Sequence, residues 1–480
     1  MPSVGDVMTA LLLTGCLAAI GCSPTDHGPD LVGGSDAAGG LGGGGAGGGQ
    51  AGGAGGAAVD LNQQLRDLLD TLEPPLTPLQ PVAPPDAALV ALGEALFFDP
   101  ILSGNKDVSC ASCHHPAFAT GDGLSLSVGT GATGIGPDRA EPGYPGFLAR
   151  HARTLFNVGD PGFERLYWDG RVERLSNGSL RTPLGIDPLP GLASPLAAQA
   201  LIPVLDRAEM RGQSGDETVT GESNELALID DADPVAALAA VMARLEAIPG
   251  YQTLFQAAFG PGPWTFADAA NALAAYETAA FATQPTSWDA YVAGDDDAIT
   301  EATKLGALLF YGGLGCSKCH SGPLLTDHDF HNIGVVQIGP GVGDAAPFDV
   351  GRQGVTGDPE DRFAFRTPSL RNVVHSAPYM HDGAYPELGA VFIHYGAPLN
   401  GHASYDGSWL HVDLVQTVQT SPDHVEEITG VLSDELATTP QFAGFSNVRE
   451  FLEALTDPSF ADLANAVPST TVSGLPLQAE

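Results

Sequence analysis

Basic residues are scarce in this chain, and their scarcity excludes several kinds of partner. Lys and Arg together number 19, against 58 Asp and Glu, so the formal net charge is −39. A surface of this sign repels the phosphate backbone of nucleic acids and anionic lipid surfaces. We therefore expect no nucleic-acid partner. A small basic electron-transfer protein would be attracted to such a surface, although high solubility accounts for the same charge equally well.

Long hydrophobic runs are also lacking. The apolar run Met8–Gly21, "MTALLLTGCLAAIG", is too short to span a bilayer but has the length of the hydrophobic region of a signal peptide. No Lys or Arg precedes Arg66, so the positive charge typical of such a signal is missing. We still expect residues 1–22 to direct export, which places the protein in the periplasm or cell envelope.

The two cysteines of this leader suggest a lipid anchor. "LTGC" ends at Cys16 and "AIGC" ends at Cys22, and both resemble the lipobox of bacterial lipoproteins. We favour Cys22 because polar residues follow it, while cleavage without lipidation is the alternative. Residues 23–60 are rich in glycine and are expected to form a flexible linker. The lipid is the only membrane attachment that we expect.

Cysteine itself is rare, with six in 480 residues, and beyond Cys22 every cysteine lies in a C-x-x-C-H motif. The two motifs comprise Cys110, Cys113 and His114, and about two hundred residues later Cys316, Cys319 and His320. In a c-type cytochrome the two thiols form thioethers with a haem, and the adjacent histidine binds its iron. The repeated motif favours two covalently bound haems c.

Zinc and a redox disulfide are the alternatives to haem. Cys316 and Cys319 are followed by His328 and His331, which together would complete a Cys2His2 zinc site. The first motif has no comparable pair of histidines nearby. A redox disulfide does not require the histidine that follows both motifs. Haem is therefore the favoured interpretation.

The hydrophobic periodicity predicts a mostly α-helical fold with long loops. Thr265 and Asp268 are expected to cap one helix. Loops as long as Gly121–Gly146 and Gly334–Asp361 suggest that the chain wraps a large prosthetic group. Helices are expected at Leu61–Leu72, Asp86–Phe98, Pro234–Ile248, Thr265–Ala282, Ile299–Tyr311, Pro386–Tyr395, Pro422–Leu436 and Asn447–Leu455.

The two motifs also suggest two domains. Each motif follows a helical run that begins with Leu-Gly, in "LGEALFFDPILSGNKDVSCASCH" and "LGALLFYGGLGCSKCH", which indicates a weak internal duplication. We expect an N-terminal domain at residues 61–284, a C-terminal domain at residues 285–465 and a tail at residues 466–480.

The order of five motifs resembles the bacterial di-haem cytochrome c peroxidase and MauG family. They are the first C-x-x-C-H, "WDGR" from Trp168, "PVLDRAEM" ending at Met210, the second C-x-x-C-H, and "FRTPSLRNVVHSAPYMHDG" from Phe365. The resemblance implies two cytochrome c-like domains packed face to face. It also implies a peroxidatic haem in the N-terminal domain and an electron-transfer haem in the C-terminal domain.

The resemblance assigns roles to two further residues. Trp168 matches the tryptophan between the two haems, where an indole relays electrons, although a buried core tryptophan is the simpler interpretation. Glu209 matches the acid near the peroxide, where a carboxylate moves a proton between the two oxygens. The alternative for Glu209 is a solvated glutamate at the end of a helix.

Two departures place the chain near MauG within this family. Many of the peroxidases have a histidine that ligates the N-terminal iron before activation, and Thr130 stands at the matching position, so that iron is expected to be open. The distal ligand of the C-terminal haem is a Met in typical peroxidases and a Tyr in MauG, and here the position is Tyr395. An ordinary core tyrosine is the alternative, and His394 is a rival turned about 100° away on the helix.

The family also binds a calcium ion between its domains, through an Asn that corresponds to His151 here. The backbone carbonyls of Ser376 and Pro378 are further candidate ligands, but His is a poor ligand for a hard cation, so calcium stays an open expectation.

The family resemblance predicts reduction of hydrogen peroxide, with electrons from a small donor such as a cytochrome c or a cupredoxin. Peroxide-dependent oxidation of a protein substrate, as in MauG, and a non-enzymatic di-haem electron carrier are the alternatives.

Overall fold

A computed structural model describes residues 60–139, 146–398, 402–436 and 444–477. The predicted export signal, both leader cysteines and nearly all of the glycine-rich linker lie outside these residues. The described helices are α1 Leu61–Leu69, α2 Ala87–Phe98, α3 Cys110–Cys113, α4 Pro195–Gln199, α5 Leu201–Leu205, α6 Pro234–Glu246, α7 Pro249–Phe259, α8 Phe266–Ala280, α9 Ser287–Val292, α10 Glu301–Leu308, α11 Gln353–Thr356, α12 Leu388–Gly396, α14 Val412–Val415, α15 Pro422–Thr429 and α16 Phe445–Glu453.

Strands are few and short. β1 Arg165–Leu166, β2 Val172–Arg174, β3 Leu180–Thr182 and β4 Gly185–Ile186 form an antiparallel sheet, and β5 Phe330–His331 pairs with β6 Phe365–Arg366. Segments of two or three residues show no alternating pattern, so the sequence analysis missed this sheet. It also missed α7, because Pro249 at the start of α7 separates it by only two residues from the end of α6. The fold is mostly helical, as predicted.

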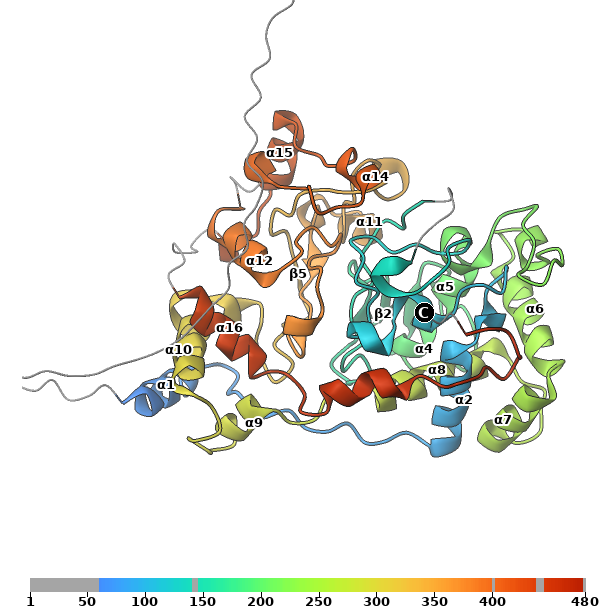
Figure 1. Cartoon of the computed structure of the whole chain (residues 1–480), viewed down its shortest axis with the longest axis horizontal. Coiled ribbons are helices and arrows are strands. Elements are labelled where there is room, and N and C mark those ends of the chain that lie inside the picture. The colour runs from blue at the N-terminus through green and yellow to red at the C-terminus, as the bar shows by residue number, and fades with distance from the viewer. Residues whose placement is uncertain (1–59, 140–145, 399–401, 437–443, 478–480) are drawn as a thin grey trace, which may run out of the picture. The chain divides into compact units, whose positions relative to one another are not determined.

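The helices form two lobes (Figure 1). In each lobe two helices cross closely at a glycine. In the first lobe α2 crosses α8 at Gly93, where an added Cβ atom would lie 2.0 Å from the carbonyl oxygen of Ala272. In the second lobe α10 crosses α16 at Gly306, where a Cβ atom would lie 1.9 Å from the carbonyl oxygen of Asn447. Only glycine permits backbones to approach this closely. Both glycines belong to the repeated Leu-Gly runs, so the internal duplication is also structural.

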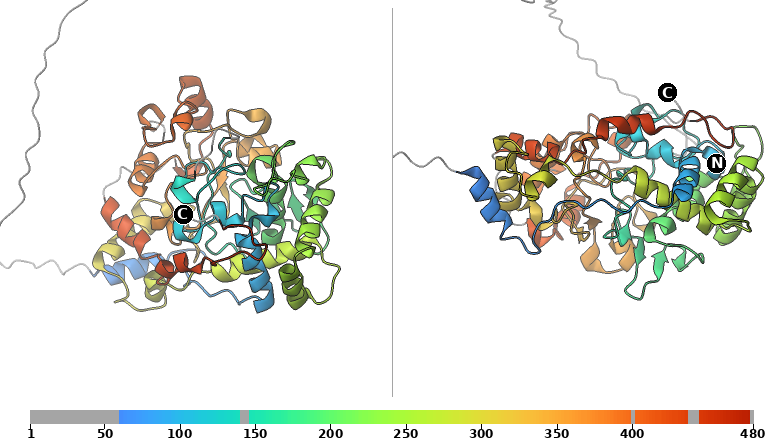
Figure 2. Two further views of the ribbon diagram at one scale, coloured as in Figure 1. Left: turned by 45° about the vertical axis from the view of Figure 1, so that its right-hand side comes forward. Right: turned by 90° about the horizontal axis from the view of Figure 1, so that it is seen from below.

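Each end of the described chain packs against the lobe that the other end of the sequence forms. Leu65 and Leu69 of α1 are buried in the core of α9, α10 and α16, although α1 precedes the first lobe in sequence. The C-terminal segment runs the other way, and the Ser473 hydroxyl donates to Asp99 at the end of α2, at 2.6 Å. Figure 2 shows the chain running from α1 to α2 beneath the molecule. The predicted boundary near Gln284 stays a prediction.

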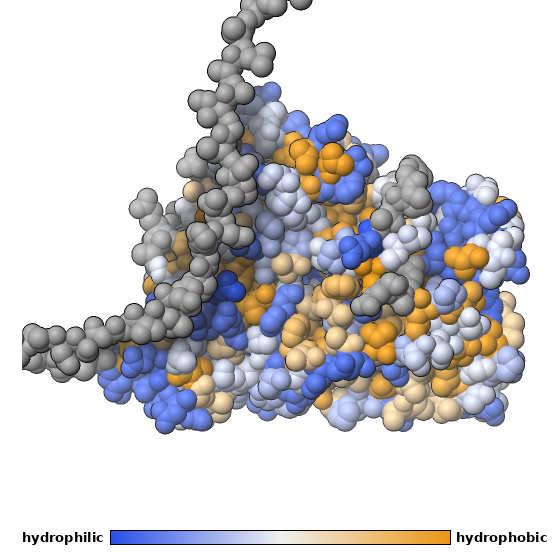
Figure 3. All heavy atoms as spheres, in the orientation of Figure 1, coloured by the Kyte–Doolittle hydropathy of each residue, from blue (hydrophilic) through white to orange (hydrophobic). Residues whose placement is uncertain are grey.

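One face of the molecule carries its hydrophobic residues in small groups. On the face in Figure 3 they alternate with hydrophilic residues and form no single band. Within the described residues, no helix has the length and apolar character needed to cross a membrane.

A buried ion pair stabilises the second lobe and gives a first prediction. Asp289 and Arg371 have side chains that are 2% and 1% exposed, and both Arg371 terminal nitrogens donate to the Asp289 carboxylate, at 2.5 and 2.8 Å. We expect Asp289→Ala to lower the free energy of unfolding by about 3–5 kcal/mol, because the Arg371 guanidinium would lose its buried carboxylate partner. Guanidinium unfolding of the holoprotein measures this change.

The half-exposed pair of Arg66 and Asp296 supplies the control. We expect Asp296→Ala to cost less than about 1 kcal/mol, because solvent screens this pair. Equal unfolding midpoints for the two variants would contradict the assigned importance of the buried pair.

Candidate functional site

The N-terminal C-x-x-C-H motif presents its side chains from a single helical turn. Cys110 and Cys113 begin and end α3, and Ser109 and Ser112 cap this turn reciprocally. Both thiols are free, so no disulfide joins them. The Nδ1 of His114 lies 3.0 Å from the carbonyl oxygen of Thr120. A carbonyl accepts only from a protonated nitrogen, so Nε2 keeps its lone pair for a metal.

The C-terminal motif repeats this arrangement. Cys316 opens a short 3₁₀ turn, and Cys316 and Cys319 are free thiols. The Nδ1 of His320 lies 3.1 Å from the carbonyl oxygen of Leu325. Burial lowers the pKa of His114 to about 4 and also lowers that of His320, so both imidazoles are neutral at pH 7 and able to bind iron. Free thiols beside an oriented imidazole fit a covalently bound haem in both lobes.

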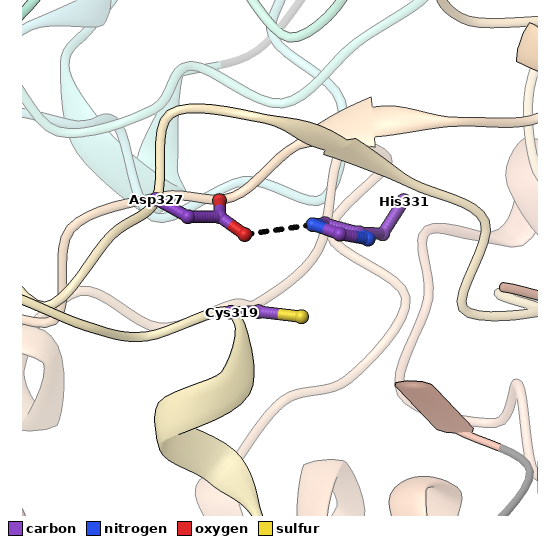
Figure 4. A group of neighbouring side chains, drawn as sticks. All are labelled: Cys319, Asp327 and His331. Atoms are coloured by element: carbon purple, nitrogen blue, oxygen red, sulfur yellow. Dashed lines mark hydrogen bonds and ion pairs between the residues drawn. The ribbon is translucent and has the colours of Figure 1, made fainter. Parts of the chain in front are cut away.

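The alternative Cys2His2 zinc site is not assembled. His328 packs edge-on against Phe163, with ring centroids 4.7 Å apart, and is absent from the cluster that Cys319, Asp327 and His331 form. Figure 4 shows that cluster, in which His331 Nε2 contacts Asp327 Oδ2 at 2.8 Å. This hydrogen bond, together with a contact to the Cys319 thiol, raises the pKa of His331 to about 10. The two histidines of the expected Cys2His2 set are therefore not brought together.

A largely apolar cavity opens beside the C-terminal motif. Its lining includes both cysteines of the motif, His320, Trp168 and Tyr395. Tyr395 reaches the cavity from α12, and burial raises the pKa of its phenol above the usual value. His394 is engaged elsewhere, because its two ring nitrogens contact the Tyr385 hydroxyl at 2.9 Å and the carbonyl oxygen of Ile333 at 2.8 Å. The structure therefore brings Tyr395, and not His394, to the cavity that holds His320.

His381 is a cavity residue that the sequence analysis did not single out. It lies at the cavity wall, and its ring stacks on Phe365 with centroids 3.6 Å apart. Its Nε2 is buried and has no hydrogen-bond partner among the described residues. Burial lowers the pKa of His381 to about 3, so the ring is neutral. Its place beside Met380 in "PYMHDG" was visible in the sequence, but its orientation was not.

Trp168 stands at the wall between two cavities. It lines the cavity of the C-terminal motif and a second cavity that contains His151. The Trp168 side chain is 8% exposed, and its Nε1 donates to the carbonyl oxygen of His151 at 3.1 Å. Backbone pairing of Trp168 with Arg366, at 2.7 Å, fixes the tryptophan beside β6. Its predicted electron-relay role stays a prediction.

Glu209 is placed near the N-terminal motif by a π-helical turn, Arg207–Arg211. The Asp206 carboxylate caps this turn by accepting from the backbone N–H groups of Ala208 and Glu209, both at 2.9 Å. Burial and the negative charge of Asp206 together raise the pKa of Glu209 to about 7, against the opposing charge of Arg171. The charge of Glu209 in turn contributes to the raised pKa values of both motif thiols, so its carboxylate lies within electrostatic reach of them.

Arg171 and Tyr167 are neighbours of Glu209 that the sequence analysis did not assign. The Arg171 guanidinium lies 4.5 Å from the centre of the Tyr167 ring. Both residues interact electrostatically with Glu209. Arg171 ends the "WDGR" motif, so its sequence position was visible, but its proximity to Glu209 depends on the fold of the β1–β2 connection.

Thr130 fixes the loop that covers Glu209. Its buried hydroxyl donates to Asp107 Oδ1 at 2.9 Å and accepts from Asn105 Nδ2 at 2.9 Å, and its backbone N–H donates to the carbonyl oxygen of Glu209 at 3.0 Å. The neighbouring Gly129 allows this approach, because a Cβ atom there would lie 2.8 Å from the Glu209 Cα. The loop thus carries a hydroxyl in place of a histidine and is held against Glu209.

Comparisons with known proteins agree with this geometry. Residues 87–297 match the family model described as di-haem cytochrome c peroxidase. The methylamine utilization protein MauG of Methylorubrum extorquens is 33% identical over 307 residues, which are 64% of this chain and 68% of that protein. The chain belongs to the di-haem cytochrome c peroxidase family. It is therefore an oxidoreductase with two covalently bound c-type haems, and the predicted family and cofactor are confirmed.

Other members of the family support the same assignment. The cytochrome-c peroxidase IdrP1 of Pseudomonas sp. is 30% identical over 332 residues, which are 64% of this chain and 72% of that protein. A crystal structure of a MauG-like protein associated with microbial copper homeostasis covers 80% of this chain and 94% of its own, with a TM-score of 0.55 and 26% identity. The diheme peroxidase BthA of Burkholderia thailandensis shares the fold, with a TM-score of 0.54, 22% identity and coverage of 84% and 93%.

The calcium expected from the family does not fit the residues present. His151 donates through Nδ1 to the carbonyl oxygen of Leu124 at 2.8 Å, and its own carbonyl oxygen accepts from Trp168. The cavity that contains His151, Ser376 and Pro378 is lined by Arg153 and Arg366 and by no carboxylate among the described residues. Calcium prefers several oxygen ligands, usually including carboxylates, so this lining is unsuitable.

The loop at Thr130 gives a prediction about stability. Thr130→Val keeps the shape of the side chain but leaves Asp107 and Asn105 each without one hydrogen bond, and we expect a loss of about 1–3 kcal/mol in the free energy of unfolding. Denaturant unfolding of the holoprotein measures it. Thr130→Ser keeps the hydroxyl and is the matched control, so equal losses in the two variants would show that the hydrogen bonds contribute nothing.

Proposed function

We propose that the N-terminal haem site reduces hydrogen peroxide and that the C-terminal haem site supplies the electrons. The observation that carries this assignment is the asymmetry of the two sites. The N-terminal motif has a carboxyl group of raised pKa held near it, and the C-terminal motif shares its cavity with a tyrosine. The bound haems supply the redox chemistry. Overall, one peroxide, two protons and two electrons give two waters.

Glu209 is the proton-transfer residue in this proposal. A carboxylate takes a proton from one peroxide oxygen and returns it to the other, which makes the departing oxygen a water. A pKa of about 7 suits both halves of this transfer at neutral pH. The hydrogen bond from Thr130 to the Glu209 carbonyl oxygen holds the Glu209 backbone in place.

Trp168 is the proposed connection between the sites. Its indole borders the C-terminal cavity and contacts the His151 carbonyl on the opposite side. The net charge of −39 favours a small basic electron-donor protein, such as a cytochrome c or a cupredoxin. Covalent haem attachment agrees with export to the periplasm or cell envelope, and the lipid anchor at Cys22 or Cys16 belongs to the same proposal.

Tyr395 shares its cavity with His320 and would supply an oxygen ligand to the C-terminal haem iron. A phenolate ligand lowers the potential of a haem and stabilises higher oxidation states. Together with the 33% identity to a MauG, this tyrosine favours a second candidate function, the peroxide-dependent oxidation of a protein substrate. In that case the electrons would come from side chains of the partner.

The test of the proposed function is the pH dependence of peroxide reduction. Glu209 must be ionised to accept a proton, so the rate should fall as pH drops through about 7. Glu209→Gln should slow the reaction by about 10²–10⁴-fold and remove this pH step. Rapid mixing of the holoprotein with peroxide from pH 5 to 9 measures both effects.

The exposed Glu217 supplies the control for this experiment. Glu217→Gln should leave the rate and its pH profile unchanged. A holoprotein that does not react with peroxide, with both irons six-coordinate in its EPR spectrum, would instead identify an electron carrier. A modified Tyr or Trp on a partner protein would support the second candidate.

The proposed tyrosine ligand is tested by spectroscopy. Tyr395→Phe should convert the C-terminal haem from a six-coordinate to an open, high-spin iron in the EPR spectrum, because phenylalanine offers no ligand atom. Tyr405→Phe is the control, since the Tyr405 hydroxyl donates to the backbone oxygen of Ala384 at 2.7 Å. An unchanged spectrum of the Tyr395 variant would exclude Tyr395 as the ligand.

A further inference from the structure

The second cavity, which we name the central cavity, has an unusual charge. Its lining includes His151, Arg153, Trp168, Arg366 and Ser376, and no Asp or Glu among the described residues. It shares Trp168 and Arg366 with the cavity of the C-terminal haem. On its other side, the backbone of Arg153 interacts with the imidazole of His114. The central cavity therefore lies between the two haem-binding motifs.

The two arginines of this cavity have no carboxylate partner among the described residues. Arg366 is 1% exposed, and its guanidinium donates only to the backbone oxygens of Tyr167 at 3.3 Å and Thr367 at 3.1 Å. Arg153 buries its Nη2 without a hydrogen-bond partner in the described part of the chain. Burial lowers the pKa of Arg153 to about 10, which still leaves its guanidinium charged at pH 7. Two buried guanidinium groups thus face one cavity.

Buried cations without an anion are costly, so the cavity requires negative charge. Among the described residues, Glu277 is the carboxyl group whose charge acts on Arg153, and burial raises the pKa of Glu277 to about 8. Glu277 is therefore mostly neutral at pH 7. The anion must come from outside the polypeptide.

We propose that the central cavity binds carboxylate and excludes calcium, with Arg153 as the fixed cation of the site. The carboxylates are those of the bound haems, each of which carries two, because the cavity shares Trp168 and Arg366 with the cavity of His320 and its Arg153 contacts His114. A planar guanidinium binds a carboxylate through two parallel hydrogen bonds. A calcium ion would instead need several oxygen ligands. This proposal rests on the presence of the haems and is independent of the proposed peroxide chemistry.

The first test needs no variant. The holoprotein is dialysed against calcium chloride, then against buffer, and its metal content is measured, with isothermal titration of calcium chloride as a second measurement. We expect no retained calcium and no binding heat. One tightly bound calcium per chain would overturn the proposal.

The second test measures the reduction potentials of both haems by spectroelectrochemical titration. Arg153→Gln removes a positive charge beside the haem carboxylates, which favours the ferric state, so at least one potential should fall. Arg153→Lys keeps the charge and should restore most of the difference. Arg165→Gln, at a more exposed arginine paired with Asp329, is the control and should leave both potentials unchanged. Unchanged potentials in Arg153→Gln would overturn the role of Arg153.

Formate distinguishes the source of the carboxylate. If the haem carboxylates occupy the central cavity, titration of the wild-type holoprotein with formate should leave both potentials unchanged. A saturable shift in wild type that disappears in Arg153→Gln would show that the cavity takes a free anion, which would overturn the assignment to the haem. Because these readouts are metal content and potential, a failure of peroxide turnover leaves them interpretable.

Discussion

The hydrogen bonds that orient His114 and His320 are the constraint on which both haem sites depend. Each imidazole donates Nδ1–H to a carbonyl oxygen a few residues ahead, Thr120 and Leu325, which leaves the lone pair of Nε2 for a metal. The loop after each motif must therefore return to the histidine. In each lobe this loop follows a helix that crosses another helix at a glycine, Gly93 in the first lobe and Gly306 in the second.

The two C-x-x-C-H motifs are alike, and the residues that the rest of each lobe brings near them differ. The N-terminal site receives Glu209 on a π-helical turn, held by the loop of Thr130, and the C-terminal site receives Tyr395 from α12. The motif and its oriented histidine are arranged in the same way in both lobes. The proposed division between a proton-transferring site and an electron-supplying site thus depends on elements added to one repeated framework.

Local signals were readable from the sequence, whereas contacts between distant segments were not. The capping box of Thr265 and Asp268 is confirmed, because both partners lie within one helical turn. The position of Tyr395 on the cavity side of α12 likewise follows from helical spacing. The burial of α1 in the second lobe and the meeting of Arg153 with Arg366 depend on tertiary packing, for which a single sequence offers no periodic signal.

The segment from Arg150 to Thr154 carries two buried arginines, Arg150 and Arg153, whose charges are treated differently. Arg150 is ion-paired with Asp169 and Asp349, at 2.6 Å each, and although burial opposes ionisation of Asp349, Arg150 lowers its pKa to about 2. This compensated group anchors the segment beside Trp168. Arg153, three residues on, has no such compensation in the described structure. Two carboxylates thus neutralise Arg150, whereas Arg153 has no carboxylate partner among the described residues. In our proposal a haem carboxylate provides the negative charge for Arg153.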